Sequence, residues 1–171
     1  TGINDDPVAV NDTDSVNEDE TVTKTGAQDD LLNDDSDLDD SASLSVTNIS
    51  HSNGNTGTVA SSSTYASNGT QIVGTYGTLT VGADGSYTYT ADQDAADSIA
   101  NGSSETDVFT YTVSDGSATD TATITITVNG ADNEVAGVND TGAVDDDSTL
   151  SVGNQSAGVL SNDTDNGSAA L

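Results

Sequence analysis

Apolar residues recur at every second position in several short stretches of the chain, and this period of two limits the possible folds more than any other feature. The clearest stretch is 119–129, where Thr occupies most of the positions between apolar side chains. A period of two buries one side of an extended strand and exposes the other. The same parity appears at Leu44 and Val46, Leu79 and Val81, Tyr87 and Tyr89, and Phe109, Tyr111 and Val113. These stretches are therefore predicted to be β-strands.

Turn signals separate the alternating stretches. They are the pairs Asn53-Gly54, Asn68-Gly69, Asp84-Gly85, Asn101-Gly102 and Asp115-Gly116. Such pairs favour the tight turns that join antiparallel strands. Because helical periodicity is nearly absent, we expect an all-β fold, an antiparallel β-sandwich with a thin apolar core and an acidic surface.

The charge balance restricts the partners of the chain. Of its 171 residues, 30 are acidic and Lys24 is the only Lys or Arg, which gives a formal net charge of −29. Nucleic acid and anionic membrane surfaces require a basic surface, so neither is an expected partner. With no Cys and a single His, thiolate and His-rich zinc sites are excluded. No apolar run is long enough to insert into a membrane.

A sequence repeat appears at an offset of 128 residues. VNDT at 10–13 recurs at 138–141, and LLNDDSD at 31–37 matches VLSNDTD at 159–165. We therefore expect an internal part of a longer protein with four segments: a linker (1–7), a complete repeat (8–128), a second linker (129–135) and the N-terminal part of the next repeat (136–171). Alternatively, the folded unit is out of phase with the repeat and spans about 44–171.

The acidic residues are clustered near the expected strand ends, often with the spacing Asp-x-Asp. Ca²⁺ takes six to eight oxygen ligands, and short Asp side chains let backbone carbonyls join the shell. The excess of Asp over Glu and the recurrence of the clusters therefore favour Ca²⁺ as cofactor over Mg²⁺, zinc or copper. The alternative is a uniformly acidic surface that is solvated and screened by salt.

Several motifs together resemble a known family. INDDPVAVND, VNEDE, LLNDDSDLDD, DGSYTYTAD and DVFTYTVSDGSATDTATITITVNGADN are similar to the bacterial cadherin-like repeats of giant surface adhesins of the RTX type, the VCBS and tandem-95 repeats. The resemblance covers most of 1–135 and weakly 136–165. It implies an Ig-like or cadherin-like Greek-key β-sandwich in a tandem array.

The resemblance also implies a set of calcium ligands. They are Asn4, Asp5 and Asp6 in the first linker, Glu18 and Asp19 near the first strand, Asp35 and Asp37 in the Asp-x-Asp loop, Asp115 in the last turn, Asp132 and Asn133 in the second linker, and Asp163 and Asp165 in the second copy. With domains stacked end to end, Asp35, Asp37 and Asp115 would face the preceding linker, whereas Glu18 and Asp19 would face the following one.

The function expected from this family is that of a non-catalytic, extracellular extender at the bacterial cell surface, of the kind associated with biofilms. Calcium would stiffen the junctions between adjacent repeats of one monomeric chain, and the array would project a distal binding domain. The alternative is a calcium-dependent polysaccharide-binding module that uses Tyr65 or Tyr76. Catalysis is not expected, because the paired carboxylates lie in charged, Gly-rich loops. We expect His51 to be a partly exposed strand residue.

Overall fold

The computed structural model describes residues 3–26, 29–39, 43–131, 135–136 and 164–165. The chain divides into two compact units, residues 1–131 and 132–171. In the second unit, β10 (Val135–Ala136) pairs antiparallel with β11 (Thr164–Asp165). Neither the linker boundaries nor the phase of the repeat is tested by this division, so both stay predictions.

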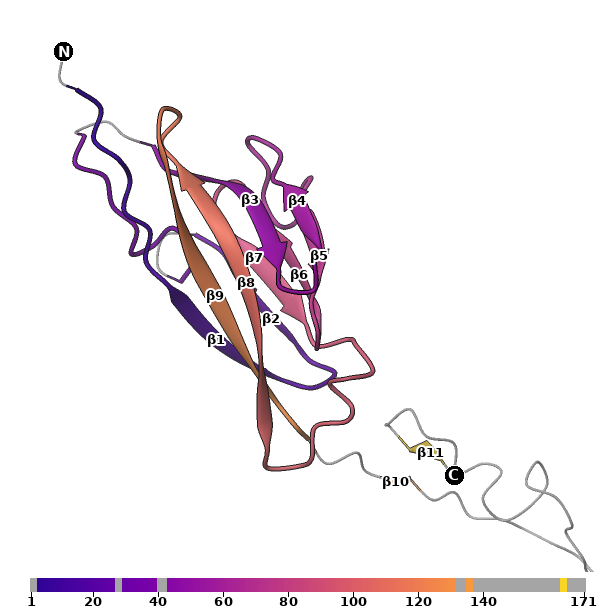
Figure 1. Cartoon of the computed structure of the whole chain (residues 1–171). Coiled ribbons are helices and arrows are strands. Elements are labelled where there is room, and N and C mark those ends of the chain that lie inside the picture. Colours follow the sequence, from indigo (N-terminus) through magenta and orange to yellow (C-terminus); the bar gives the residue numbers. More distant parts are fainter. Residues whose placement is uncertain (1–2, 27–28, 40–42, 132–134, 137–163, 166–171) are drawn as a thin grey trace, which may run out of the picture. The chain divides into compact units, whose positions relative to one another are not determined.

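Two β-sheets make up the first unit (Figure 1). The larger sheet has the order β1-β9-β8-β3-β4, in which β1 runs parallel to β9 and the other neighbours are antiparallel. Its strands are β1 (Asp12–Asn17), β3 (Ser45–His51), β4 (Thr56–Thr58), β8 (Ser104–Ser114) and β9 (Thr119–Asn129).

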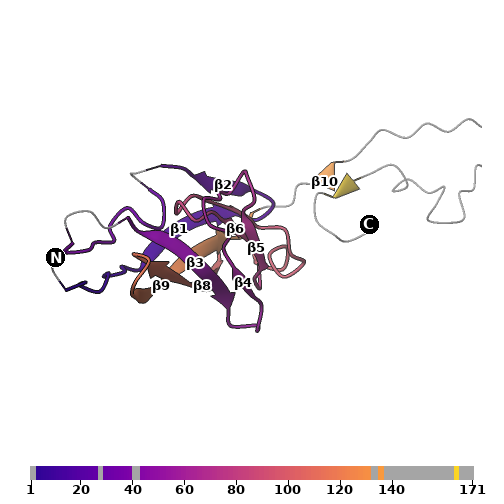
Figure 2. The same ribbon diagram turned by 90° about the horizontal axis from the view of Figure 1, so that it is seen from above.

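The smaller sheet is entirely antiparallel, with the order β2-β7-β6-β5. Its strands are β2 (Thr21–Lys24), β5 (Thr70–Val73), β6 (Thr78–Val81) and β7 (Tyr87–Thr90). The view turned by 90° shows the two sheets as separate layers (Figure 2). No helix occurs in the part of the chain that the structure describes, and so none there could span a bilayer.

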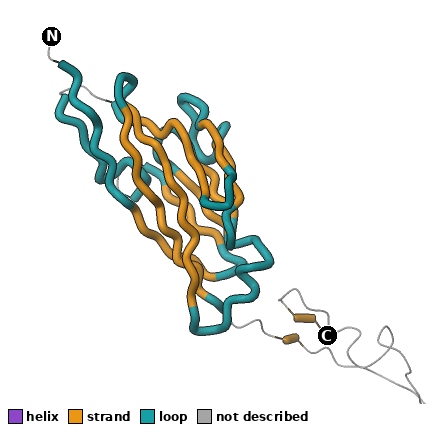
Figure 3. The backbone as a smooth tube through the Cα atoms, viewed as in Figure 1, coloured by secondary structure: helices purple, strands orange, loops and turns teal. Residues whose placement is uncertain are grey.

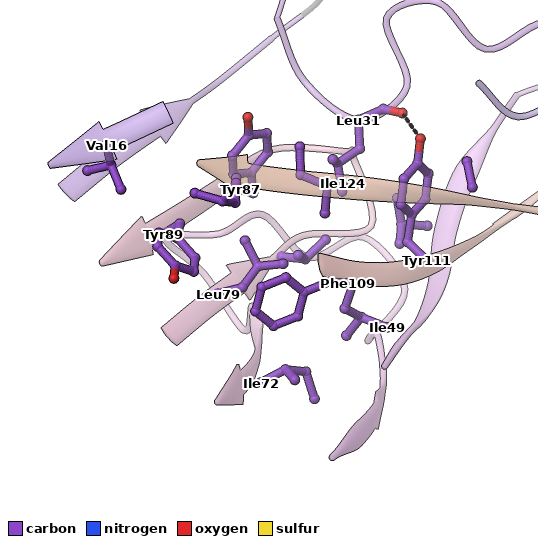
Figure 4. Close-up of a cluster of buried hydrophobic side chains, with 14 of the residues drawn as sticks. Val16, Leu31, Ile49, Ile72, Leu79, Tyr87, Tyr89, Phe109, Tyr111 and Ile124 are labelled. Atoms are coloured by element: carbon purple, nitrogen blue, oxygen red, sulfur yellow. Dashed lines mark hydrogen bonds between the residues drawn. The ribbon is translucent and has the colours of Figure 1, made fainter. Parts of the chain in front are cut away.

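The core fills the space between the sheets (Figure 4), and it includes most of the side chains that the alternation pointed to, together with others that it did not, such as Leu31, Ile49 and Ile72. Tyr89, Phe109, Tyr111, Ile124 and Ile126 are fully buried. Along β9, buried and partly exposed positions alternate as the sequence predicted. Each large apolar side chain removed from water contributes about 1.5–3 kcal/mol. The fold class predicted from the sequence, an all-β sandwich, is confirmed; one pair of neighbours, β1 with β9, is parallel where an antiparallel sandwich was expected.

Loop segments extend the first unit beyond its strands at the end where β1 begins (Figure 3). Residues 3–11 run beside residues 29–39, and the backbones of Val8 and Ser36 exchange two hydrogen bonds of 2.8 and 3.0 Å. This arrangement brings the first predicted linker against the predicted Asp-x-Asp loop. At the other end of β1, the chain turns through Glu18 and Asp19 before it enters the smaller sheet.

Candidate functional site

The loop end of the sandwich gathers carboxylates from three distant parts of the chain. Asn4 Nδ2 donates to Asp115 Oδ2 (2.9 Å), and Asp5 N–H donates to Asp39 Oδ2 (3.0 Å). Asp115 lies in the β8–β9 turn, so the first linker contacts the last turn of the sandwich. Hydrogen bonds from the backbone amides of Ala118 and Ser117, and then from Asn4, lower the pKa of Asp115. Asp115 is therefore held as an anion.

Asp35 and Asp37 each have one carboxylate oxygen without a hydrogen-bond partner in the part of the chain that the structure describes. Asp35 Oδ1 accepts from Val10 N–H (2.7 Å), and Asp37 Oδ1 accepts from Asp39 N–H (2.8 Å). The Oδ2 atoms of both residues are inaccessible to solvent and have no hydrogen-bond partner among the described residues. Burial raises the pKa of Asp35 to about 6, and nearby carboxylates add to this effect. An acceptor in this state favours a proton or a cation.

A further carboxylate lies close to this end, at the start of β1. Asp12 Oδ2 is 2.6 Å from the Tyr111 hydroxyl, which also lies 2.8 Å from Val10 O and 3.1 Å from Leu31 O. Figure 4 shows the contact with Leu31. One hydroxyl hydrogen cannot serve three acceptors at once. Burial raises the pKa of Asp12 to about 7, with a contribution from Asp34 and its neighbours. The Asp12 carboxyl therefore keeps its proton up to a pH well above the range in which an aspartic acid usually ionises.

Glu18 is the most isolated carboxylate at the opposite end of β1. Its backbone N–H donates to Asn129 O (2.9 Å), which ties it to the end of β9. The side chain is only 3% exposed, and neither Oε1 nor Oε2 has a hydrogen-bond partner within the described ranges. Two orphaned acceptors on one buried carboxylate cost folding free energy unless a cation or donor satisfies them.

The remaining predicted ligands are placed as follows. Asp6 is exposed beside the buried Pro7. Asp19 is exposed with φ of 61°, and its backbone N–H donates to Ala91 O. Asp132, Asn133 and Asp163 lie outside the described residues, and for Asp165 only its place in β11 is described.

The donor chemistry at both ends suits Ca²⁺, because buried, orphaned carboxylate oxygens are the hard ligands that this ion prefers. The described residues do not complete a shell, however: among them, no three carboxylate or imidazole side chains come close enough to hold one metal ion. A calcium site at either end would therefore be incomplete within the described residues. Further oxygens would have to come from backbone carbonyls, water or residues outside the described ranges.

One buried carboxylate that the sequence did not single out is fully satisfied. Asp107 is 0% exposed, and it accepts from Thr75 N–H, Tyr76 N–H and Tyr89 Oη–H at 2.9–3.1 Å. His51 Nε2 lies 2.8 Å from Asp107 Oδ1, while His51 Nδ1 accepts from a backbone amide. The hydrogen of this imidazole is therefore on Nε2. These contacts join β8 to the β5–β6 turn and to β7, across the two sheets.

The prediction that His51 is partly exposed is wrong, because His51 is 7% exposed. It is the last residue of β3 and packs against the Phe109 ring, with ring centroids 4.9 Å apart. The pairing with Asp107 could not be found from sequence spacing, since the two residues come from strands distant in the chain. The period-two pattern around Phe109 does place Asp107 on the buried face, and this was the available signal.

A shallow hollow lies beside the turn before β8. Its volume is about 500 Å³, and its lining mixes apolar and polar groups. The lining residues are Tyr76, Ala95, Ser98, Ile99, Ala100, Ser103 and Glu105. Tyr65, the other tyrosine considered for sugar stacking, does not line it.

Comparison with known proteins gives one family match. A family model described as a bacterial cadherin-like domain matches residues 4–130, about three quarters of the chain. This range contains both ends of β1 and every strand of the two sheets. No curated protein matches the chain.

Proposed function

The chain belongs to the bacterial cadherin-like domain family, and from this membership we propose that it is a calcium-stiffened extender repeat of a bacterial surface adhesin. Domains of this family are adhesin-type repeats typical of extracellular proteins, generally non-catalytic, and they typically bind calcium. The proposal adds that calcium binds at the two ends of this sandwich and stiffens its junctions with adjacent repeats. The observation that carries it is the set of orphaned carboxylate oxygens at both ends of β1.

The mechanism is electrostatic. Without a cation, Glu18 holds two unsatisfied acceptors at one end, and Asp35 and Asp37 hold one each at the other. Like charges at a junction repel, so the linker stays free to bend. A Ca²⁺ ion that also takes ligands from the adjoining linker would satisfy these oxygens and fix the joint. The calcium, when bound, supplies this bridging charge, and the chain supplies the oxygens and the rigid strand between the ends.

Because Ca²⁺ would bind the folded chain and not the unfolded chain, it would also stabilise the fold by mass action. At a Ca²⁺ concentration about a hundredfold above Kd, the gain is about 3 kcal/mol, which raises the melting temperature by roughly 5–10 °C. Calorimetry of the 171-residue chain with Ca²⁺, and then with excess chelator, measures this effect. Mg²⁺ at the same concentration is the control. A melting curve that neither Ca²⁺ nor chelator moves would refute calcium binding.

Stiffening is a separate claim with its own measurement. Small-angle scattering of a protein with at least two complete repeats should give a longer maximum dimension with Ca²⁺ than with chelator. Calcium binding without any such change would leave a calcium-dependent domain that is not an extender.

The hollow lined by Tyr76 supports a second candidate, a polysaccharide-binding module. An aromatic side chain beside hydroxyl and carboxylate groups can contact the apolar face and the hydroxyls of a sugar. Titration with neutral oligosaccharides such as cellohexaose and maltoheptaose, followed by calorimetry, tests it. Tyr76→Ala should abolish binding and Tyr65→Ala should preserve it; no binding to either sugar by the unsubstituted chain argues against this candidate.

A further inference from the structure

Five Asn-Gly pairs occur in the chain, and the structure describes four of them: Asn53-Gly54, Asn68-Gly69, Asn101-Gly102 and Asn129-Gly130. In such a pair the glycine amide nitrogen can attack the asparagine side-chain carbonyl carbon, because glycine has no side chain to obstruct the approach. The reaction needs a free side chain, a free glycine N–H and room for the backbone to rotate. The four pairs differ in all three respects.

Asn101-Gly102 meets each of these requirements. Both residues are exposed, and neither the Asn101 side chain nor the Gly102 N–H makes a hydrogen bond within the described part of the chain. Gly102 has φ of +78°, and a Cβ placed on it would meet nothing within 4 Å. One backbone hydrogen bond closes the turn, from Ser103 N–H to Ala100 O (2.8 Å). The flanking residue Ser103 is anchored to Gly130, but the two groups that react, the Asn101 side chain and the Gly102 N–H, are held by no hydrogen bond within the described residues.

Asn53-Gly54 is equally exposed but is held in place. Asn53 Nδ2 donates to Val73 O (3.0 Å), Asn53 Oδ1 accepts from Asn55 N–H (3.0 Å), and Gly54 N–H donates to His51 O (3.0 Å). Both the attacked group and the attacking nitrogen are thus engaged. Because each hydrogen bond must open before ring closure, the reaction at Asn53 is slowed by about tenfold or more.

The other two pairs are held by the backbone. Asn129 ends β9, and Gly130 N–H donates to Ser103 O (3.0 Å). At Gly69, a Cβ would lie 2.7 Å from Tyr65 O and 2.8 Å from Thr80 Cγ2, so the backbone is tightly packed there. Asn68 itself has φ of +56°. Neither pair can rotate without disturbing its neighbours.

We propose that Asn101 is a site of spontaneous modification in the folded protein, where Asn101-Gly102 cyclises and hydrolyses ahead of the other described Asn-Gly pairs. Gly102 N forms a bond to Asn101 Cγ, the Cγ–Nδ2 bond breaks, and ammonia leaves with the glycine amide proton. Water then opens the five-membered succinimide at either carbonyl, which gives aspartate or isoaspartate. No oxidation or reduction occurs, and water is the only other reactant.

The product carries one more negative charge, and this charge lies at the end of the sandwich where Glu18 is found. Ser103 O binds Gly130 N–H, and Glu18 N–H binds Asn129 O, so the Asn101 turn and Glu18 are anchored to consecutive residues at the end of β9. A new carboxylate therefore appears at the end of the sandwich that carries the orphaned Glu18 side chain. If that end binds calcium, as in the proposed function, the modification adds a carboxylate near the ion.

Peptide mapping of the folded 171-residue chain tests the proposal without reference to calcium. The chain is incubated in mildly alkaline, calcium-free buffer and sampled over days. Because Lys24 is the only tryptic site, chymotrypsin is the suitable protease: cleavage after Tyr89 and Phe109 isolates Asn101, and cleavage after Tyr65 and Tyr76 isolates Asn68. Tandem mass spectrometry then locates the replacement of an amide by an acid, and the isoaspartate, at each Asn, because the peptide after Tyr111 contains both Asn129 and Asn166.

The expected result is conversion at Asn101 about tenfold or more faster than at Asn53, Asn68 and Asn129, with similar rates at all four in concentrated guanidinium chloride. Asn101→Gln, which would have to form a less favourable six-membered ring, should lose the mass gain in its peptide. Asn101 staying intact in the folded chain while it converts in denaturant would overturn the proposal. Equal rates at the four pairs in the folded chain would also overturn it.

Discussion

Single carboxylates in this unit differ mainly in whether they have donors. Asp107 is fully buried and has four donor groups, whereas Glu18 is almost as buried and has none within the described residues. A buried anion with hydrogen-bond donors is stable by itself, but one without donors is stabilised only by a proton or a cation. Burial alone therefore does not identify a metal ligand in this fold, and the missing partner is the informative observation.

Removing the charge of Glu18 should have opposite effects with and without calcium. Glu18→Gln eliminates an unpartnered buried charge, so the calcium-free protein should gain about 1–2 kcal/mol of unfolding free energy. The calcium-induced rise in melting temperature should shrink in the same variant, because one ligand is weakened. Calorimetry with Ca²⁺ and with chelator measures both. Glu20→Gln, an exposed neighbour, is the matched control, and identical behaviour of the two variants would contradict a special role for Glu18.

Removing the charge of Asp107 should instead lower the unfolding free energy. Asp107→Asn places an amide N–H₂ among donors from His51, Thr75, Tyr76 and Tyr89, so at least one buried donor loses its acceptor. We expect a loss of about 3 kcal/mol or more, with and without calcium. Urea unfolding measures it, with the exposed Asp94→Asn as control. A loss that calcium rescues would mean that Asp107 takes part in ion binding.

The raised pKa values of Asp12 (about 7) and Asp35 (about 6) predict a pH dependence. Both carboxyls bind protons more tightly in the folded chain than at the ordinary value of 3.8, so the unfolding free energy should fall as pH rises from about 4 to about 7. Calcium-free urea titrations across this range measure the slope. Asp12→Asn should flatten it, and a stability that increases over this range would rule out the assignment.

At the scale of elements, the alternation of apolar and polar residues sets the strands, and long-range pairing sets the sheet edges. Thr side chains on the outer face of the smaller sheet form hydrogen bonds between neighbouring strands, as Thr21 Oγ1 does with Thr90 Oγ1 (2.9 Å). The inner face of β9 supplies Ile124 and Ile126 to the core, while Val108 of β8 is 39% exposed. The two faces of one sheet should therefore tolerate the same truncation very differently.

Truncation of Ile124 tests this difference. Ile124→Ala leaves a cavity between the sheets and should reduce the unfolding free energy by about 2–5 kcal/mol. Val108→Ala, on the outer face of the neighbouring strand, should change it by about 0.5 kcal/mol or less. Urea unfolding of both variants measures the difference, and similar losses would show that the thin core does not carry the stability of the unit.

At the scale of the whole molecule, the net charge of −29 opposes compaction by self-repulsion. NaCl screens this repulsion at all carboxylates alike, whereas a site-bound ion acts at particular ones. In chelator, raising NaCl should therefore raise the melting temperature by several degrees, and Ca²⁺ at matched ionic strength should raise it further. Calorimetry compares the two salts, and an equal effect would favour the solvation alternative over specific binding.

The amino-acid sequence by itself determined the strands with a clear alternation, which are β3, β6, β7, β8 and β9, and the buried faces of these strands. It did not predict β1, β2, β4 or β5. Alternation is a local property, so the pattern of 119–129 sufficed to place Ile124 and Ile126 inside. The motifs also pointed to the family, and they pointed to the first linker and Asp115, which the structure brings into contact.

Only the tertiary structure decided which carboxylates are left without partners. Burial and hydrogen bonding depend on chain segments that are far apart in sequence, such as the β9 end beside Glu18 or the His51 imidazole beside Asp107. The parallel pairing of β1 with β9 likewise follows from packing and not from any local signal. An acidic sequence thus specifies where negative charge lies along the chain, but the fold alone determines which of these charges water and protein donors leave unsatisfied.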